Sequence, residues 1–244
     1  MDYRAPSFPA HEGPTLDTLV AGGAAMQQAM REARRLAATD ETSLIVGPGS
    51  GVGKRTFARA IHRASRRAAG PLVVFGPQSV ASSMLASDLY GDSGQSGAFA
   101  QAAGGTLVVW HAEFCPAEAR PRLLEVLRTG LLDGGTGRPH QARVLVTIAI
   151  PGRWPELEGL SLPRLTLPVF SGRDDLAELA RHLLRQYAPH GPRPGAFLTD
   201  EARRAIEAHP WPGGAREMEV YLARAVQGSE RDALTAHDLG LPAA

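Results

Sequence analysis

The chain has 244 residues, 43% hydrophobic and 21% charged, enough apolar material for one large domain or a medium domain with a small partner. With 26 basic and 25 acidic residues, its net charge of +1 gives no electrostatic reason to expect a nucleic acid or a membrane surface as partner. One cysteine, Cys115, excludes an internal disulfide framework, and no apolar run approaches the roughly 18 residues that span a bilayer. We therefore expect a cytoplasmic protein without a signal peptide.

In chain order, residues 1–16 contain Pro, Gly and mixed charge without periodicity, which predicts a flexible N-terminal arm. Apolar residues at helical spacing follow over residues 24–38. Short apolar runs then predict buried strands within 42–47, 70–76, 105–110, 142–150 and 162–170, and helical patterns lie between them within 53–67, 81–91 and 116–130. This alternation predicts an α/β core over residues 17–172, a mostly parallel sheet flanked by helices.

The pattern changes after residue 172. Three helical patterns, within 173–188, 199–209 and 213–228, follow one another with no strand pattern between them. We therefore expect a small all-helical subdomain over residues 173–244, in which Trp211 is a packing anchor.

The stretch "GPGSGVGK", residues 47–54, fits the G-x-x-x-x-G-K core of a P-loop and lies between a predicted strand and a predicted helix. Its glycines allow successive backbone N–H groups to converge on phosphate oxygens, the helix start adds a favourable dipole, and Lys54 supplies a point charge. The alternative is a glycine-rich turn with an incidental lysine. The motif predicts an ATP or ADP site formed by Gly47, Gly49, Ser50, Gly51, Val52, Gly53, Lys54, Arg55 and Thr56.

From about residue 19 to residue 241 the sequence resembles the central AAA+ domain of bacterial sigma-54-dependent transcription activators. The resemblance is carried above all by "GSGVGKRTFARAIHRAS", "GAFAQAAGGTLVV" and "WPGGARE". It implies a P-loop AAA+ fold with a helical lid, and ATP bound between the subunits of a ring. It also implies that Arg216 is a lid residue that reaches the nucleotide; the alternative is a surface arginine paired with Glu217 or Glu219.

Five departures from the family pattern fall on its chemistry. The Asp-Glu pair that the family has after the strand at 105–110 is replaced by Trp110 and His111, and Glu113, offset by two positions, would have to reach back from the following loop. Gly76 stands in place of an asparagine of the family. Ile148 and Ala149 replace its polar sensor pair, and Pro155 and Ser161 replace its two arginine fingers. We therefore expect no catalytic residue and no metal site, since no carboxylate pair remains to hold magnesium.

The fifth departure is the loop "GAFTGA", with which the family contacts a sigma factor. Here "LYGDSGQS" runs almost directly into "GAFAQAAGGTL", and the "GAFA" at residues 97–100 matches a later element of the family by its position. The missing loop argues against contact with a sigma factor. The chain ends shortly after the last helical pattern, so we do not expect direct DNA binding.

Together these features predict a nucleotide-binding pseudo-ATPase that acts as a regulatory or scaffolding subunit, with a homo-oligomer or an active AAA+ paralogue as partner. One alternative is a weak ATPase in a mixed ring with an active sigma-54 activator. Another is a structural interaction domain whose nucleotide site is empty and closed by Trp110. A nucleophile couple of His111 and Cys115 would lack an orienting acid.

Overall fold

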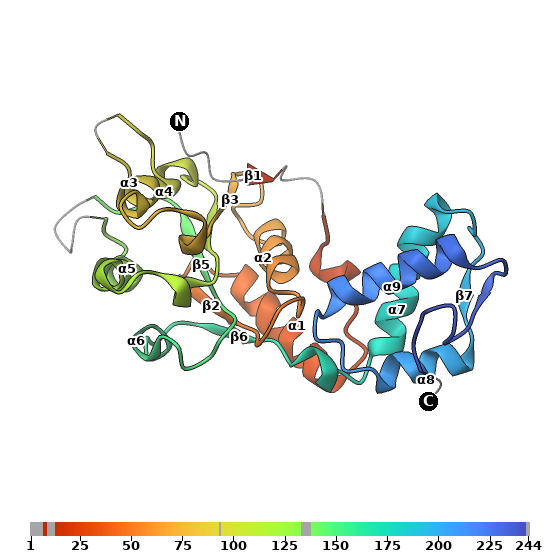
Figure 1. The fold of residues 1–244 in the computed structure, drawn as a ribbon. Helices are drawn as coiled ribbons and strands as arrows, with labels where there is room; N and C mark the ends of the chain where they lie inside the picture. The colour runs from red at the N-terminus through yellow and green to blue at the C-terminus, as the bar shows by residue number, and fades with distance from the viewer. Residues whose placement is uncertain (1–6, 9–12, 93, 133–137, 243–244) are drawn as a thin grey trace. The chain divides into compact units, whose positions relative to one another are not determined.

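The computed structural model describes residues 7–8, 13–92, 94–132 and 138–242, which form two compact units (Figure 1). Unit 1 contains the chain up to Leu19, Ala29–Pro48 and Lys54–Leu167. Unit 2 contains Val20–Gln28, Gly49–Gly53 and the chain from Pro168 onward. The boundary expected at residue 172 stays a prediction; the sequence pattern did not assign the two early segments of unit 2. Among the described residues, no helix has the length and apolar character needed to cross a membrane.

A six-stranded sheet forms the centre of unit 1, in the order β1-β3-β4-β5-β2-β6. Its five parallel strands are β2 (Ser43–Val46), β3 (Leu72–Phe75), β4 (Thr106–Val109), β5 (Arg143–Ile148) and β6 (Arg164–Thr166). Strands β2 to β5 are buried along their whole length, as expected for parallel strands covered on both faces. This confirms the predicted α/β fold class.

The sixth strand, β1 (Ser7–Phe8), lies within residues 1–16, where the sequence predicts a flexible arm. The arm as a whole stays a prediction. β1 pairs antiparallel with β3 at the edge of the sheet, with Ser7 opposite Val73. Leu16, which begins a short 3-10 helix, is buried as well. Two residues are too few to produce a periodic pattern, which is why β1 could not be predicted from the sequence. Residues 1–6 and 9–12 of the predicted arm lie outside the described residues.

Helices cover both faces of this sheet (Figure 1). Alternate strand residues, among them Phe75, Val109 and Val146, share one buried cluster with apolar side chains from the helices on that face. These helices are α3 (Leu85–Tyr90), α4 (Ala98–Gln101), α5 (Arg120–Thr129) and α6 (Pro155–Glu158). The opposite alternation faces the layer of α1 (Ala24–Ala37) and α2 (Lys54–Arg63); α2 begins at Lys54, the last residue of the predicted P-loop.

A close backbone approach at the start of β4 depends on Gly105. A Cβ at this position would lie 2.0 Å from the Pro71 carbonyl oxygen and 2.6 Å from the Pro71 nitrogen, both backbone atoms next to β3. We expect Gly105→Ala to destabilise unit 1 by about 3 kcal/mol, because β3 and β4 must separate to admit the methyl group. Urea unfolding measures this loss, and Gly228→Ala, where no atom lies within 4 Å of the new Cβ, is the control. An unchanged midpoint for Gly105→Ala would contradict the expected collision.

Unit 2 contains three longer helices, α7 (Leu176–Tyr187), α8 (Asp200–Ala208) and α9 (Ala215–Gly228). It is helical as predicted, with one addition: β7 (Phe197–Leu198) and β8 (Ala233–Leu234) form a two-stranded parallel pair. Because each strand has two residues, the pair left no pattern in the sequence.

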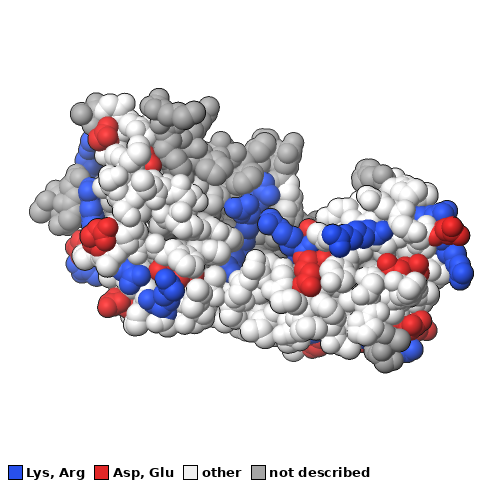
Figure 2. Space-filling view, viewed as in Figure 1, with Lys and Arg blue, Asp and Glu red and all other residues white. Residues whose placement is uncertain are grey.

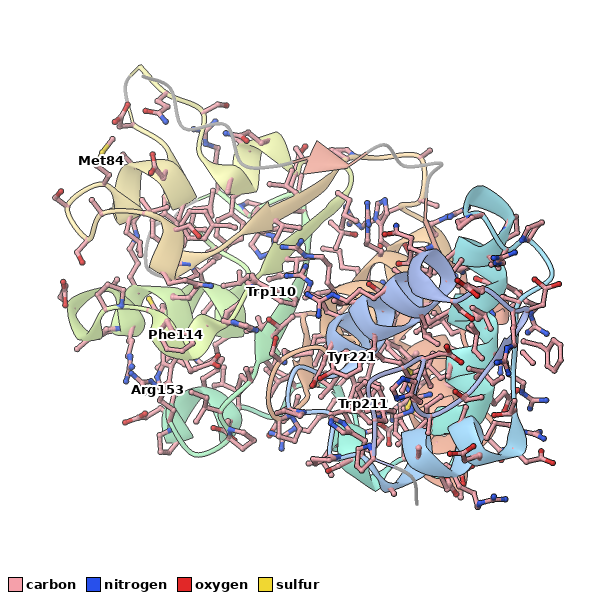
Figure 3. All side chains as sticks on the ribbon, turned by 45° about the vertical axis from the view of Figure 1, so that its right-hand side comes forward. Met84, Trp110, Phe114, Arg153, Trp211 and Tyr221 are labelled. Carbon is pink, nitrogen blue, oxygen red and sulfur yellow. The ribbon has the colours of Figure 1, made fainter. Side chains whose placement is uncertain are left out.

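Trp211 packs inside unit 2, as predicted. Its side chain is 2% exposed, its Nε1–H donates to the Ile206 carbonyl oxygen at 2.7 Å, and its ring meets Tyr221 edge-on at 5.5 Å between centroids (Figure 3). The indole therefore anchors the turn that leads from α8 into α9.

Candidate functional site

The candidate site of unit 1 lies at the carboxyl ends of β2, β4 and β5, the edge where open parallel sheets bind ligands. Two hydrogen bonds tie the segments that leave β2 and β4 to β5. The Gly47 N–H donates to the Ile148 carbonyl oxygen at 3.0 Å, and the His111 N–H donates to Thr147 Oγ1 at 2.8 Å. The side chains that follow β2 and β4 are thereby held at the end of β5.

Lys54, the first residue of α2, is the single lysine of the chain; the other 25 basic residues are arginines. Its side chain is 3% exposed, and its Nζ donates to the Gly47 carbonyl oxygen at 2.7 Å. Burial lowers the pKa of Lys54 to about 8, and the nearby Glu113 carboxylate opposes this shift. Burial thus disfavours the positive charge of this ammonium group, and a bound anion would stabilise that charge.

The turn between Gly47 and Lys54 uses its glycines as the motif requires. Gly49, Gly51 and Gly53 have φ values of 80°, 69° and 103°, which side-chain-bearing residues rarely adopt. Of the residues between them, Ser50 is exposed and Val52 is buried. The backbone of this turn therefore depends on glycine at every second position.

Within unit 2, Gly51 lies against the residues that precede α9. Its carbonyl oxygen accepts a hydrogen bond from the Ala215 N–H at 3.1 Å, and a Cβ on Gly51 would lie 2.2 Å from the Gly213 carbonyl oxygen. From the other side, a Cβ on Gly214, whose φ is 64°, would lie 2.7 Å from the Gly51 Cα. The glycines of "WPGGARE" thus have a packing role in addition to any role in ligand binding.

The remaining predicted residues differ in their surroundings. Arg55 is exposed, with its guanidinium 5.2 Å from the centre of the Trp110 ring, and Thr56 is half-buried on α2. Arg216 is exposed on α9 of unit 2 and, among the described residues, forms no ion pair with Glu217 or Glu219. The role of Arg216 as a nucleotide contact, and the alternative of a surface arginine, both stay predictions.

The segment after β4 begins with two stacked rings, Trp110 and His111, with centroids 4.4 Å apart. His111 has a left-handed backbone, φ 53° and ψ 57°, and its Nε2 is buried without a hydrogen-bond partner among the described residues. Burial, Lys54 and Arg55 together lower the pKa of His111 to about 4, so its ring is neutral at pH 7. A neutral imidazole of this pKa is a weak base and an indole has no acceptor, so this pair does not replace two carboxylates.

Glu113 is the functional candidate that sequence reasoning underrated. It lies in a short 3-10 helix (Ala112–Phe114), is fully buried, and does reach back to the sheet from this loop. Its Oε1 accepts hydrogen bonds from the N–H groups of Ala149 at 2.8 Å and Ile150 at 3.1 Å, while Oε2 is buried with no hydrogen-bond partner among the described residues. The spacing of residues in the sequence did not predict the position of this carboxylate, because the backbone turn at His111 decides where the side chain points.

At the other positions where the chain departs from the family pattern, the structure shows packing in place of polar chemistry. Ile148 is fully buried at the end of β5, and Gly76 precedes a 3-10 turn. Pro155 begins α6 beside Trp154, which is 1% exposed in the core. Arg153 is exposed and lies 4.9 Å from the centre of the Phe114 ring (Figure 3).

The "GAFA" segment is part of the packed core and not an exposed loop. Gly97 precedes α4, and Phe99 is 1% exposed and stacked against Tyr90 with centroids 5.8 Å apart. A Cβ on Gly97 would lie 2.2 Å from the Gly91 nitrogen. These contacts agree with the position-based interpretation of the segment.

The visible face of each unit carries both basic and acidic side chains (Figure 2). Within the described ranges, no three His, Cys, Asp or Glu side chains come together as a metal site would need. Cys115 is 2% exposed and burial raises its pKa to about 11, which excludes it as a nucleophile near neutral pH.

Comparison with known proteins decides the family. The model of the Sigma-54 interaction domain matches residues 19–151, and the model of the AAA+ ATPase lid domain matches residues 172–242.

The chain belongs to the sigma-54 interaction domain family.

Two curated relatives illustrate the similarity of this sigma-54 interaction domain to transcription regulators. It is 33% identical over 239 residues to the DNA-binding transcriptional regulator NtrC of Rhizobium meliloti, a match that covers 89% of this chain and 49% of NtrC. It is 34% identical over 235 residues to the acetoin catabolism regulatory protein of Cupriavidus necator, covering 86% of this chain and 35% of that protein. The chain therefore spans between a third and a half of the length of these relatives.

Solved structures of NtrX from Brucella abortus share the fold. The complex with ADP superposes with a TM-score of 0.79 at 27% identity, covering 94% of this chain and 56% of that chain. The complex with ATP gives a TM-score of 0.78, again at 27% identity, covering 96% and 57%.

Proposed function

We propose that this sigma-54 interaction domain binds ATP or ADP at residues 47–56 without hydrolysing it, and acts as a regulatory or scaffolding subunit in transcription control. The observation that carries this proposal is Lys54. In a chain with 25 arginines, the single lysine stands at the end of the glycine turn and at the start of α2. There its ammonium is 3% exposed and hydrogen-bonded to Gly47.

An incidental lysine would gain from solvent exposure, since burying an ammonium group costs free energy. Lys54 bears this cost, as its lowered pKa shows, and phosphate oxygens would offset it. The positive-φ glycines and the start of α2 are the other groups that a phosphate chain requires. The NtrX complexes with ADP and ATP support a nucleotide on this fold.

Loss of hydrolysis is inferred from the residues after β4. Magnesium would find the Thr56 hydroxyl near the loop, but Trp110 and His111 offer it no carboxylate. Attack by water needs a base, and His111 is a weak one because its pKa is about 4. The residues thus fit a nucleotide better than they fit a nucleotide with its magnesium ion.

The partner that we propose is a protein: a second copy of this chain or an active AAA+ relative, in the cytoplasm where transcription takes place. A sigma factor is a poorer candidate, because the "GAFA" segment is packed around Phe99.

Two alternative functions are each supported by a specific observation. Glu113, a buried carboxylate at the site, favours a weak ATPase in a mixed ring, and the Trp110–His111 stack favours a structural domain with a closed site.

Melting-temperature titrations with ATP and ADP, with and without magnesium, test the proposal. Nucleotide at a hundred times its dissociation constant should stabilise the protein by about 2.7 kcal/mol, and the shift should persist without magnesium. Lys54→Ala should abolish the shift, because the turn then lacks its only ammonium group. Arg59→Ala, one turn further along α2, is the control and should keep the shift.

A melting temperature that millimolar nucleotide leaves unchanged in the unmodified protein would contradict nucleotide binding. It would favour the structural interaction domain, in which Lys54→Ala alters neither stability nor partner binding.

A further inference from the structure

We propose that Glu113 is a built-in counter-ion for Lys54 that competes with nucleotide phosphates and keeps the affinity of the site low. The inference rests on the proposed nucleotide site and adds a means of regulation: whatever withdraws or neutralises the Glu113 carboxylate strengthens nucleotide binding.

A short series of hydrogen bonds places the two charges at the same point of the sheet edge. Lys54 Nζ donates to the Gly47 carbonyl oxygen, and the Gly47 N–H donates to the carbonyl oxygen of Ile148. The next residue, Ala149, donates its N–H to Glu113 Oε1. The peptide group that binds the Glu113 carboxylate is therefore only two peptide groups away from the one that binds the Lys54 ammonium.

The carboxylate is fixed in this position. Both the Ala149 and the Ile150 N–H groups donate to Oε1, so the side chain is held by its inner oxygen. Its other oxygen, Oε2, has no hydrogen-bond partner among the described residues although Glu113 is fully buried. A buried anionic oxygen of this kind must be offset by positive charge nearby, and the Lys54 ammonium supplies it.

The surroundings favour a counter-ion over a metal ligand. Lys54 and Arg55, both basic, act on this end of the sheet, and the adjacent His111 is neutral. A third basic side chain, Arg120, donates to the Glu113 backbone carbonyl oxygen at 3.1 Å. The positive charge of these basic groups outweighs the single carboxylate, so the site as a whole repels a divalent cation. The same arrangement offers a phosphate two positive side chains, of which Lys54 is already partly neutralised by Glu113.

Removing the charge should therefore strengthen phosphate binding. We expect Glu113→Gln, whose amide oxygen still accepts from Ala149 and Ile150, to bind ADP and inorganic pyrophosphate on the order of tenfold more tightly at pH 6.5 without magnesium. Calorimetric titration measures the dissociation constants. The matched control is Glu118→Gln, an exposed glutamate of the same segment, which should bind like the unmodified protein.

A second measurement does not depend on nucleotide. Because Lys54 is the only lysine, labelling the protein with isotopic lysine yields one side-chain signal, whose titration gives its pKa directly. Glu113→Gln should lower the pKa of Lys54 further, and Glu118→Gln should leave it unchanged. An unshifted lysine signal in Glu113→Gln would overturn the counter-ion role.

The outcomes separate this inference from the proposed function. If the unmodified protein and Glu113→Gln bind ADP equally well, the proposed nucleotide site stands and the inference is overturned. Binding only by Glu113→Gln supports the inference and shows that the unmodified protein holds no nucleotide. Weaker binding of ADP with magnesium by Glu113→Gln identifies Glu113 as a metal ligand instead, which also overturns the inference.

If Glu113→Gln alone does not fold, the double variant Glu113→Gln with Lys54→Met tests the coupling of the two charges instead. Lys54→Met leaves the Glu113 charge buried without its counter-ion, so adding Glu113→Gln should raise the urea midpoint relative to Lys54→Met. A double variant no more stable than Lys54→Met would contradict the coupling of the two charges.

Discussion

ATP turnover by the purified protein is expected to be about 10² to 10⁴ times slower than that of a P-loop ATPase with a glutamate at the end of β4. That factor is the usual contribution of a positioned general base, and His111, neutral and half-buried, has a pKa of about 4. Loss of the magnesium-holding acid at Trp110 should lower the rate further. Phosphate release assayed over hours at millimolar ATP measures the residual rate.

Contaminating ATPases set the limit of such an assay, and Lys54→Ala is the control for them. We expect the unmodified protein and Lys54→Ala to give the same residual rate, because loss of both the base and the magnesium-holding acid should put the protein's own turnover below that of the contaminants. A rate that Lys54→Ala removes would show true hydrolysis and contradict the pseudo-ATPase. If Glu113→Gln removed it as well, Glu113 would be the acid responsible, and the mixed-ring ATPase would become the better hypothesis.

The affinity for ADP is expected to fall about tenfold for each pH unit above pH 8. Lys54 has a pKa of about 8 without nucleotide, and phosphate oxygens raise it in the complex. Binding therefore takes up a proton above pH 8 and none well below it. The terminal phosphate of ADP, with a pKa of about 6, is already almost fully ionised above pH 8, so it does not add to the slope there. Calorimetry between pH 6.5 and 9.5 measures the change.

Lys54→Arg is the matched control for this pH dependence. A guanidinium stays charged across the whole range, so any ADP binding by Lys54→Arg should be constant from pH 6.5 to 9.5. Proton uptake can be read from the dependence of the binding enthalpy on the buffer. A flat affinity for the unmodified protein would show that Lys54 is charged throughout and that its burial has no effect on its pKa.

Much of the fold could be predicted because parallel strands and amphipathic helices leave strong local patterns. Strands such as β3 (Leu72–Phe75) are continuous apolar runs, and α7 (Leu176–Tyr187) has apolar residues on one face. The glycine turn before Lys54 is equally local, since its function depends on consecutive backbone torsions. β1, β7 and β8 were missed because two-residue strands are held by hydrogen bonds to distant segments and carry no period of their own.

The sequence by itself determined the family, the α/β core with its helical lid, the glycine turn with Lys54, and the replacement of two acids by Trp110 and His111. Only the tertiary structure decided what the Glu113 carboxylate does. Its position follows from a left-handed residue at His111 and from two N–H groups at the end of β5, 36 and 37 residues further along the chain. Burial likewise sets the charge of Lys54 and His111, because desolvation depends on which segments meet around a side chain and not on its neighbours in the sequence.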